Sequence, residues 1–303
     1  MPVTLPQLSR RKFLKRAALA GAAAAFAPSS YARLFGKARD KHTFAIFSDT
    51  HIAADAALEH GGINMADNFA AGVRELAAWP VKPAAVIMNG DLAFKSGQPE
   101  DYPTFGKLIA PVRALAPIHL SLGNHDQREN FWSAFPHDAI RPGATLSRQA
   151  TVFAGDRANW FLLDSLDVTD HTPGELGTDQ LGWLDRELDL RSDRPAMVVC
   201  HHNLQAPGEN IGLKDSAALE ECFTRHRQVK AFIYGHTHDW HIETHASGVH
   251  LINLPPTAYV FEAGRPSGWV LCTLARDGAE FELRALDPKH PEHAQIKKLS
   301  WRA

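Results

Sequence analysis

The sequence has few of the residues that build cross-linked or thiolate-ligated proteins. It contains three cysteines among 303 residues, Cys200, Cys222 and Cys272, and none of them forms a CxxC pair. Zinc-thiolate sites and disulfide frameworks both need more cysteines, at closer spacing. Neither class is indicated. A chain of this length that is 45% hydrophobic can instead bury the core of one large domain or two small ones.

The sequence also lacks an excess of charge of either sign. It has 32 Lys and Arg residues against 34 Asp and Glu residues. A near-neutral chain offers no electrostatic footprint for a long nucleic acid, so we expect no such partner. Histidine, by contrast, is abundant. The 17 histidines are of the residue type best suited to metal ligation and proton transfer at neutral pH.

The N-terminus has the pattern of an export signal. Residues 9–15, SRRKFLK, resemble a twin-arginine signal over their whole length. The alanine-rich stretch 17–27 that follows is too short to span a bilayer. Ser30-Tyr31-Ala32 has the small residues of a cleavage site, so we expect cleavage after Ala32. The pattern predicts a periplasmic or otherwise exported protein that is delivered by the twin-arginine machinery and keeps no stable membrane anchor.

After this leader, short apolar runs alternate with helical patterns, as is typical of an α/β fold. Six runs have the length of buried strands: Phe44–Phe47, Ala84–Met88, Ile118–Leu122, Trp160–Leu163, Ala196–Cys200 and Ala231–Tyr234. Helical spacing of apolar residues occurs over Met65–Trp79 and Leu181–Leu190. Three further strands are expected over Val249–Leu254, Gly268–Ala275 and Ala279–Leu286.

No repeat or linker divides the chain beyond the leader. The expected boundaries are 1–32 for the signal peptide, 33–43 for a connector, 44–287 for one main domain and 288–303 for a polar, peripheral tail.

Polar clusters directly follow five of the six apolar runs. They are Asp49-Thr50-His51, Gly90-Asp91, Gly123-Asn124-His125-Asp126, His201-His202 and Gly235-His236-Thr237-His238. Ligands of open α/β sheets bind in the crevice at the carboxyl ends of the strands. We therefore expect clusters that are far apart in the sequence to meet at one edge.

Seven side chains in these clusters offer only oxygen or imidazole nitrogen: Asp49, His51, Asp91, Asn124, His201, His236 and His238. Such ligands are typical of Mn, Fe, Zn or Co sites. Seven exceed the needs of one tetrahedral ion and suit two ions about 3.5–4 Å apart that share a bridging carboxylate. In extended segments, Asp49 and His51 would point the same way, as would His236 and His238.

The order D-x-H, G-D, G-N-H-D, H and G-H-x-H resembles the calcineurin-like metallophosphoesterases. Gly123–Asp126 followed by Arg128 is similar to the cyclic-nucleotide and glycerophosphodiester phosphodiesterase group within them. The resemblance covers roughly residues 44–286. It implies a four-layer α/β/β/α sandwich with a binuclear metal site at the strand ends.

The resemblance also implies a role for each residue. Asp49, His51 and His238 would hold one metal, Asn124, His201 and His236 the other, and Asp91 would bridge them. A metal-bridging hydroxide would be the nucleophile. His125 would stabilise the phosphoryl oxygen and protonate the leaving alkoxide, and Asp126 would orient His125. Arg128 would contact the substrate phosphate, or it would pair with Glu129 or Asp126.

The sequence departs from the phosphodiesterase group at Asn203, because a proline commonly follows the double histidine there. This departure leaves open which histidine is the ligand. His201 is preferred over His202 because it directly follows its strand, as the other expected ligands do.

These observations predict an exported, binuclear phosphoesterase that acts on a small phosphoester, and charge favours a diester as the substrate. Two divalent ions, Asp49, Asp91 and a hydroxide leave a net charge of about +1, which a diester monoanion balances. Lys95 and Lys214 lie in loops and could add cations, so a phosphomonoesterase for phosphate scavenging is the alternative. A non-catalytic metal- or phosphate-binding protein is a third hypothesis, against which the presence of both His125 and Asp126 argues.

Overall fold

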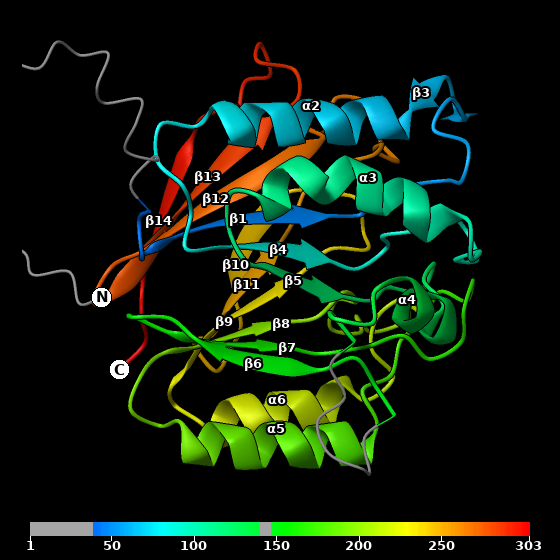
Figure 1. The fold of residues 1–303 in the computed structure, drawn as a ribbon. Coiled ribbons are helices and arrows are strands. Elements are labelled where there is room, and N and C mark those ends of the chain that lie inside the picture. The colour runs from blue at the N-terminus through cyan, green and yellow to red at the C-terminus, as the bar shows by residue number, and fades with distance from the viewer. Residues whose placement is uncertain (1–38, 140–146) are drawn as a thin grey trace, which may run out of the picture. The chain divides into compact units, whose positions relative to one another are not determined.

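The structure, a computed structural model, describes residues 39–139 and 147–303. The expected signal peptide, 1–32, and the first part of the connector lie outside the described residues. Two six-stranded sheets pack face to face, and helices cover the outer face of each (Figure 1). This is the four-layer α/β/β/α sandwich that the resemblance implies.

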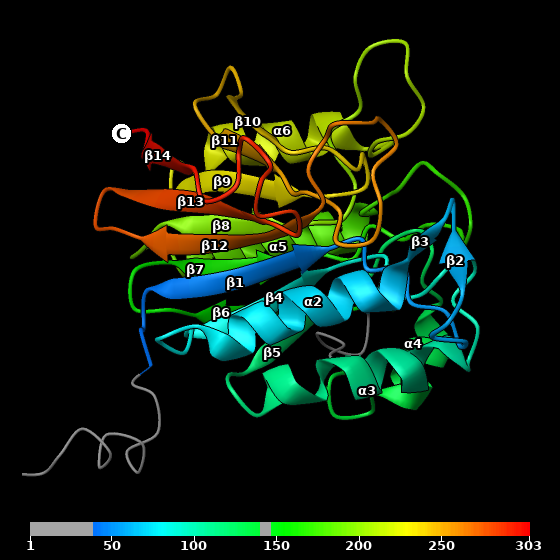
Figure 2. The same ribbon diagram turned by 90° about the horizontal axis from the view of Figure 1, so that it is seen from above.

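The first sheet has the strand order β14-β13-β12-β1-β4-β5. Its strands are β1 (Thr43–Ser48), β4 (Ala85–Asn89), β5 (Ile118–Ser121), β12 (Gly268–Leu274), β13 (Gly278–Ala285) and β14 (Ile296–Ser300). β1, β4 and β5 run parallel, whereas β12, β13 and β14 are antiparallel to their neighbours. Helices α2 (Met65–Ala78) and α3 (Asp101–Arg113) lie side by side over the outer face (Figure 2).

The second sheet has the order β10-β11-β9-β8-β7-β6. Its strands are β6 (Thr151–Ala154), β7 (Asn159–Leu162), β8 (Ala196–Val199), β9 (Val229–Tyr234), β10 (His241–Thr244) and β11 (His250–Asn253). Helices α5 (Thr178–Leu190) and α6 (Ser216–Arg225) cover its outer face (Figure 1). The short elements β2 (Glu59–His60), β3 (Ile63–Asn64) and α4 (Arg128–Ala134) complete the described part. No helix within the described ranges has both the length and the apolar content needed to cross a bilayer.

Strand β1 shows how the sequence produces these layers. All six of its residues are buried, as is typical of a strand that is covered on both faces. Phe44 and Ile46 point into the core between the sheets, and Ala45 and Phe47 point into the core under α2 and α3. The predicted strands and the two predicted helices are therefore confirmed, with ends that shift by a few residues. The sequence interpretation did not identify α3, α4, α6, β6 or β10.

The C-terminal segment differs from the peripheral tail that we expected over 288–303. Ile296–Ser300 forms β14, which pairs antiparallel with β13 at the edge of the first sheet. Its two lysines are typical of an edge strand, which must resist pairing with other chains, and they made the segment look like a solvated tail. Beyond the strand, Arg302 donates hydrogen bonds to four carbonyl oxygens, those of Val229, Ser247, Phe223 and His226.

We expect Arg302→Ala to lower the free energy of unfolding by about 2 kcal/mol or more, because four carbonyl groups lose a charged donor. Arg276→Ala is the matched control, since Arg276 lies exposed in the β12–β13 turn and should change stability by less than about 0.5 kcal/mol. Urea unfolding of both variants measures the difference. Equal stabilities would show that the hydrogen bonds of Arg302 do not stabilise the fold.

Candidate metal centre

The expected ligands come together where five strands end. Asp49 and His51 follow β1, Asp91 follows β4, Asn124 follows β5, His201 follows β8, and His236 and His238 follow β9. These strands belong to both sheets, so side chains from both sheets build the site. All seven side chains are at most 8% exposed. Burial of so many polar groups requires partners for them, and the metal hypothesis supplies such partners.

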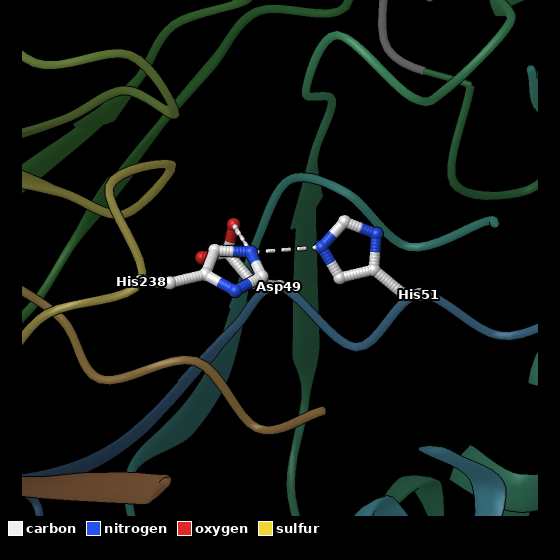
Figure 3. A group of neighbouring side chains, drawn as sticks. All are labelled: Asp49, His51 and His238. Carbon is white, nitrogen blue, oxygen red and sulfur yellow. Dashed lines mark hydrogen bonds and ion pairs between the residues drawn. The ribbon is translucent and has the colours of Figure 1, made fainter. Parts of the chain in front are cut away.

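The first group consists of Asp49, His51 and His238 (Figure 3). The Nε2 atoms of His51 and His238 lie 3.0 Å apart, and His238 Nε2 lies 3.4 Å from Asp49 Oδ1. The potential ligand atoms of the three residues lie within 4.8 Å of one another. The three side chains thus converge on one point, as ligands of a single ion do.

The second group consists of Asp91, His201 and His236. His201 Nε2 lies 3.2 Å from Asp91 Oδ2, and the same oxygen lies 3.7 Å from His51 Nε2 in the first group. Asp91 therefore faces both groups, which is the position that a bridging carboxylate needs.

Two buried atoms, one in the second group and one in the neighbouring Asn124, support a metal as the missing partner. Asn124 Oδ1 and His201 Nε2 accept no hydrogen bond from any described residue. Asn124 lines a cavity of about 250 Å³ together with Asp91, His125 and His236. Oxygen and imidazole nitrogen are ligands that Mn, Fe, Zn or Co accept. The residues present therefore fit two metal ions of unspecified identity.

Backbone carbonyls orient two of the ligand rings. Asn89 O lies 3.1 Å from His201 Nδ1, and Tyr259 O lies 2.6 Å from His238 Nδ1. A proton on Nδ1 satisfies each carbonyl and leaves the lone pair of Nε2 for a metal. Tyr259, which the sequence interpretation did not single out, also packs against the His51 ring, with centroids 5.2 Å apart.

The ligand-bearing turns are not extended, contrary to our expectation. Asp49, His51, Asp91, His236 and His238 all have left-handed backbones, with φ between 47° and 70°. In such turns side chains do not simply alternate. Asp49 and His51 do share a group, but His236 and His238 belong to different groups. Residues other than glycine adopt this conformation rarely and at a cost, which is typical of functional sites.

The glycines that precede a ligand in the polar clusters mainly allow other atoms to pack close to the backbone. Only one of them has the left-handed backbone of a tight turn. A Cβ atom on Gly123 would lie 2.2 Å from Asp91 Oδ1, and one on Gly235 would lie 2.1 Å from Ser48 Oγ. Neither glycine has a positive φ. Of the three glycines that precede a ligand, Gly90 alone has a left-handed backbone, with φ of 72°.

The electrostatics of the cluster favour a bound cation. Burial alone would raise the pKa of Asp49, but nearby His201 and His238 lower it to about 2. Burial alone would lower the pKa of His201, but Asp91 and Asp49 raise it to about 9. The two carboxylates thus require positive charge beside them. A proton on His201 or a metal ion can provide it.

Two other expected ligand rings are neutral, so that each can offer a nitrogen lone pair to a metal ion. Burial lowers the pKa of His51 to about 3 and that of His236 to about 4. Neutral imidazole is the form that binds metals.

His202 lies beside the site but belongs to no metal-binding group among the described residues. Its Nδ1 lies 2.7 Å from Ser165 Oγ, and burial lowers its pKa well below the usual value. Its ring packs against His236 with centroids 4.4 Å apart. The geometry favours His201 as the ligand, and His202 supports the ring of a ligand.

The structure corrects the expected role of Asp126. Its carboxylate accepts hydrogen bonds from the backbone N–H groups of Gly123, Leu92 and Ala93, at 2.9–3.1 Å. Asp126 therefore ties two ligand-bearing turns together and does not contact the His125 ring.

The carboxylate beside His125 is that of Asp170. Asp170 Oδ1 lies 3.4 Å from His125 Nδ1, which also lies 2.5 Å from Lys95 O. The backbone N–H of Asp170 donates to Asn124 O at 2.7 Å, so this loop docks on the G-N-H-D turn. No sequence signal marks Asp170, because it is one acidic residue in a long loop between β7 and α5.

Arg128 is likewise engaged away from the cavity. Its Nε and Nη2 donate to the buried carboxylate of Asp164, at 2.6 and 3.1 Å, and Nη2 also donates to Leu166 O. The pairing partners considered from the sequence, Glu129 and Asp126, are not the ones that it uses. The arrangement assigns Arg128 to positioning the loop that follows β7 rather than to binding substrate.

Comparison with known proteins agrees with this geometry. The model of the calcineurin-like phosphoesterase family matches residues 42–240. The chain therefore belongs to that family, and its ligand groups make it a metal-dependent phosphoesterase.

Among curated relatives, a 3',5'-cyclic-nucleotide phosphodiesterase of Nostoc is 28% identical over 73% of this chain and 80% of its own. The 3',5'-cyclic adenosine monophosphate phosphodiesterase CpdA of Pseudomonas aeruginosa is also 28% identical, over 72% and 76%. A solved dimetal phosphatase from Danio rerio has the same fold, with a TM-score of 0.66 at 17% identity over 86% of this chain and 99% of its own.

The shared position of Asp91 predicts that Asp91→Asn damages both metal sites at once. Metal analysis of the purified variant should give one ion or none, because the amide cannot supply the bridging charge. His202→Ala is the matched control and should retain more metal than His201→Ala. Two tightly bound ions in Asp91→Asn would refute the bridging role, and the reverse order of the histidine variants would exchange their assignments.

Proposed function

We propose that the protein is an exported phosphodiesterase that hydrolyses small phosphodiesters. The proposal rests on the residues that line the cavity beside the expected metal ligands. Its walls include His51, Asp91, Asn124 and His125, and no lysine or arginine is among the described residues that line it. A monoester dianion would need such a cation in addition to the metals, whereas a diester monoanion would not.

The nearby cations are engaged elsewhere. Arg128 pairs with Asp164, and Lys214 Nζ lies 2.6 Å from Asp167 Oδ2. The Lys95 ammonium lies 5.3 Å from the centroid of the Phe94 ring and does not line the cavity. The curated relatives named as cyclic-nucleotide phosphodiesterases also act on diesters, which supports the proposal.

The chain's own contribution to the chemistry centres on His125. Two divalent ions, when bound, would supply positive charge for the phosphate and make a water molecule more acidic. His125 Nδ1–H can donate to Lys95 O, which leaves Nε2 to exchange a proton with the substrate. His125 lines the cavity beside Asp91 and Asn124. From there it can protonate the leaving alkoxide, and Asp170 can stabilise the charged ring.

We expect nitrophenyl diesters to have a kcat/KM at least tenfold above that of matched monoesters on one metal-loaded preparation, with a cyclic nucleotide measured alongside. The cavity lacks the cation that a second negative charge would require. A tenfold preference for the monoester, about 1.4 kcal/mol in transition-state binding, would instead establish the phosphomonoesterase alternative.

His125→Ala should lower kcat by about 10²–10⁴ while both metals stay bound, because the variant loses acid–base assistance. The loss should be smaller for nitrophenolate, a good leaving group, than for an alkoxide. Steady-state kinetics with both leaving groups and metal analysis measure the two effects. Equal losses for both leaving groups would assign His125 to phosphate binding.

Asp170→Asn and Asp126→Asn separate the two aspartates that lie near this histidine. Asp170→Asn should show the same dependence on the leaving group as His125→Ala, with a smaller loss. Asp126→Asn should lower the melting temperature without that dependence, since its carboxylate holds backbone amides. The opposite pattern would restore the role first expected for Asp126.

The export part of the proposal is supported by residues 9–15 of the sequence alone. Replacing Arg10 and Arg11 together with lysine keeps the charge but removes the guanidinium pair of the twin-arginine pattern. We expect the precursor to accumulate in the cytoplasm. Fractionation that finds the mature protein outside the inner membrane at normal levels would contradict this route.

A further inference from the structure

A second cavity of about 440 Å³ adjoins the metal centre. The two cavities share Ile211, Thr237, His238 and Phe261 as walls. The His238 ring, a candidate metal ligand, stacks on Phe261 with centroids 4.1 Å apart. A substituent joined to a bound phosphate by a short linker would therefore enter this second cavity.

The second cavity has an excess of negative charge. Glu209, Asp239, Glu243 and Glu262 line it, and Arg265 is the single lysine or arginine among its described lining residues. Arg265 is already shared between Asp239, at 3.3 Å, and Glu262, at 3.2 Å. Glu209 and Glu243 form no ion pair with a described residue. Their charges are not compensated within the described part of the chain.

Two asparagines in the wall each have a buried amide oxygen without a hydrogen-bond donor among the described residues. Asn203 and Asn253 line the cavity and are 9% and 0% exposed. Asn203 Nδ2 donates to Leu204 O, and Asn253 Nδ2 donates to Thr237 Oγ1. Their Oδ1 atoms accept no hydrogen bond from the described residues. An unsatisfied buried acceptor costs free energy unless a ligand or water supplies the donor.

We propose that this cavity binds a primary ammonium group of the substrate, so that the preferred phosphodiesters carry a short aminoalkyl ester. The inference rests on the proposed function, because the metal centre must hold the phosphate. An ammonium has three donors and no acceptor, and it therefore matches a wall of carboxylate and amide oxygens. The substrate would be zwitterionic, with its anion at the metals and its cation in the acidic cavity.

Other occupants match the wall less well. A nucleobase presents acceptors as well as donors, and the guanidinium of Arg265, which could serve those acceptors, is already paired. A quaternary ammonium carries the charge but cannot donate hydrogen bonds to Asn203 or Asn253. These two occupants are the alternatives that the experiment separates.

The test uses metal-loaded, full-length protein and isosteric esters. The diester pair is 2-aminoethyl and propyl 4-nitrophenyl phosphate, and the monoester pair is 2-aminoethyl and propyl phosphate. We expect kcat/KM to favour the aminoethyl ester by roughly tenfold, the scale of one charged hydrogen bond. The 2-(trimethylammonio)ethyl diester and cyclic AMP should both fall below the aminoethyl diester.

Variants of the cavity wall test whether the preference for the aminoethyl ester arises from this cavity. Glu209→Gln combined with Glu243→Gln should reduce the ratio of aminoethyl to propyl kcat/KM several-fold, because the charge that attracts the ammonium is removed. Glu221→Gln is the matched control, since Glu221 is exposed on α6 and does not line the cavity. It should keep the wild-type ratio.

Three outcomes would overturn the inference: equal rates within each ester pair, a ratio that the double variant leaves unchanged, or a trimethylammonio ester or cyclic AMP that matches the aminoethyl ester. Failure of the diesterase proposal looks different, because monoesters would then react faster than diesters. The ammonium preference would still be measured within the monoester pair.

Discussion

The burial of two carboxylates at the junction of two sheets is the constraint on which the rest of the structure depends. Asp49 and Asp91 are 0% and 2% exposed, and His201 Nε2 lies within 4 Å of both. A buried charge costs several kcal/mol unless partners surround it. The imidazoles around the carboxylates and the cations that the cluster attracts therefore stabilise the fold as well as preparing the chemistry. Strand ends from both sheets must meet for this to happen, which fixes how the sheets pack.

The left-handed turns are part of the same arrangement. A residue other than glycine with a left-handed backbone costs about 1 kcal/mol or more of folding free energy. Five of the seven expected ligands have this conformation. Backbone hydrogen bonds between the turns hold them, such as His51 N to Asp91 O at 2.9 Å. Asp126 adds three more from a buried side chain. The G-N-H-D turn thus places the expected ligand Asn124, the proposed acid–base group His125 and the structural clamp Asp126 at three consecutive positions.

Local signals in the sequence predicted the strands and the ligand cluster, whereas the resemblance to a known family implied the four layers. Fully apolar runs such as Phe44–Phe47 identify buried strands, and polar residues that follow them identify strand ends. The roles of Asp126 and Arg128 could not be derived in this way, since adjacency in the sequence does not determine which groups a side chain contacts. Asp170 lies in a loop whose path depends on tertiary contacts. β14 was missed because its two consecutive lysines give the segment the pattern of a solvated tail.

The segment that follows β9 joins the candidate metal centre to the acidic cavity that is proposed to bind the substrate's ammonium group. His236 and His238 belong to different metal groups, while Thr237 between them accepts a hydrogen bond from Asn253 in the acidic cavity. Asp239, which directly follows His238, pairs with Arg265, and both residues line that cavity. One short turn therefore places both metal groups and one wall of the neighbouring cavity. A change that reshapes the cavity at Thr237 or Asn253 would also move a ligand, whereas Glu209 and Glu243, which lie outside this turn, can vary without disturbing the metal centre.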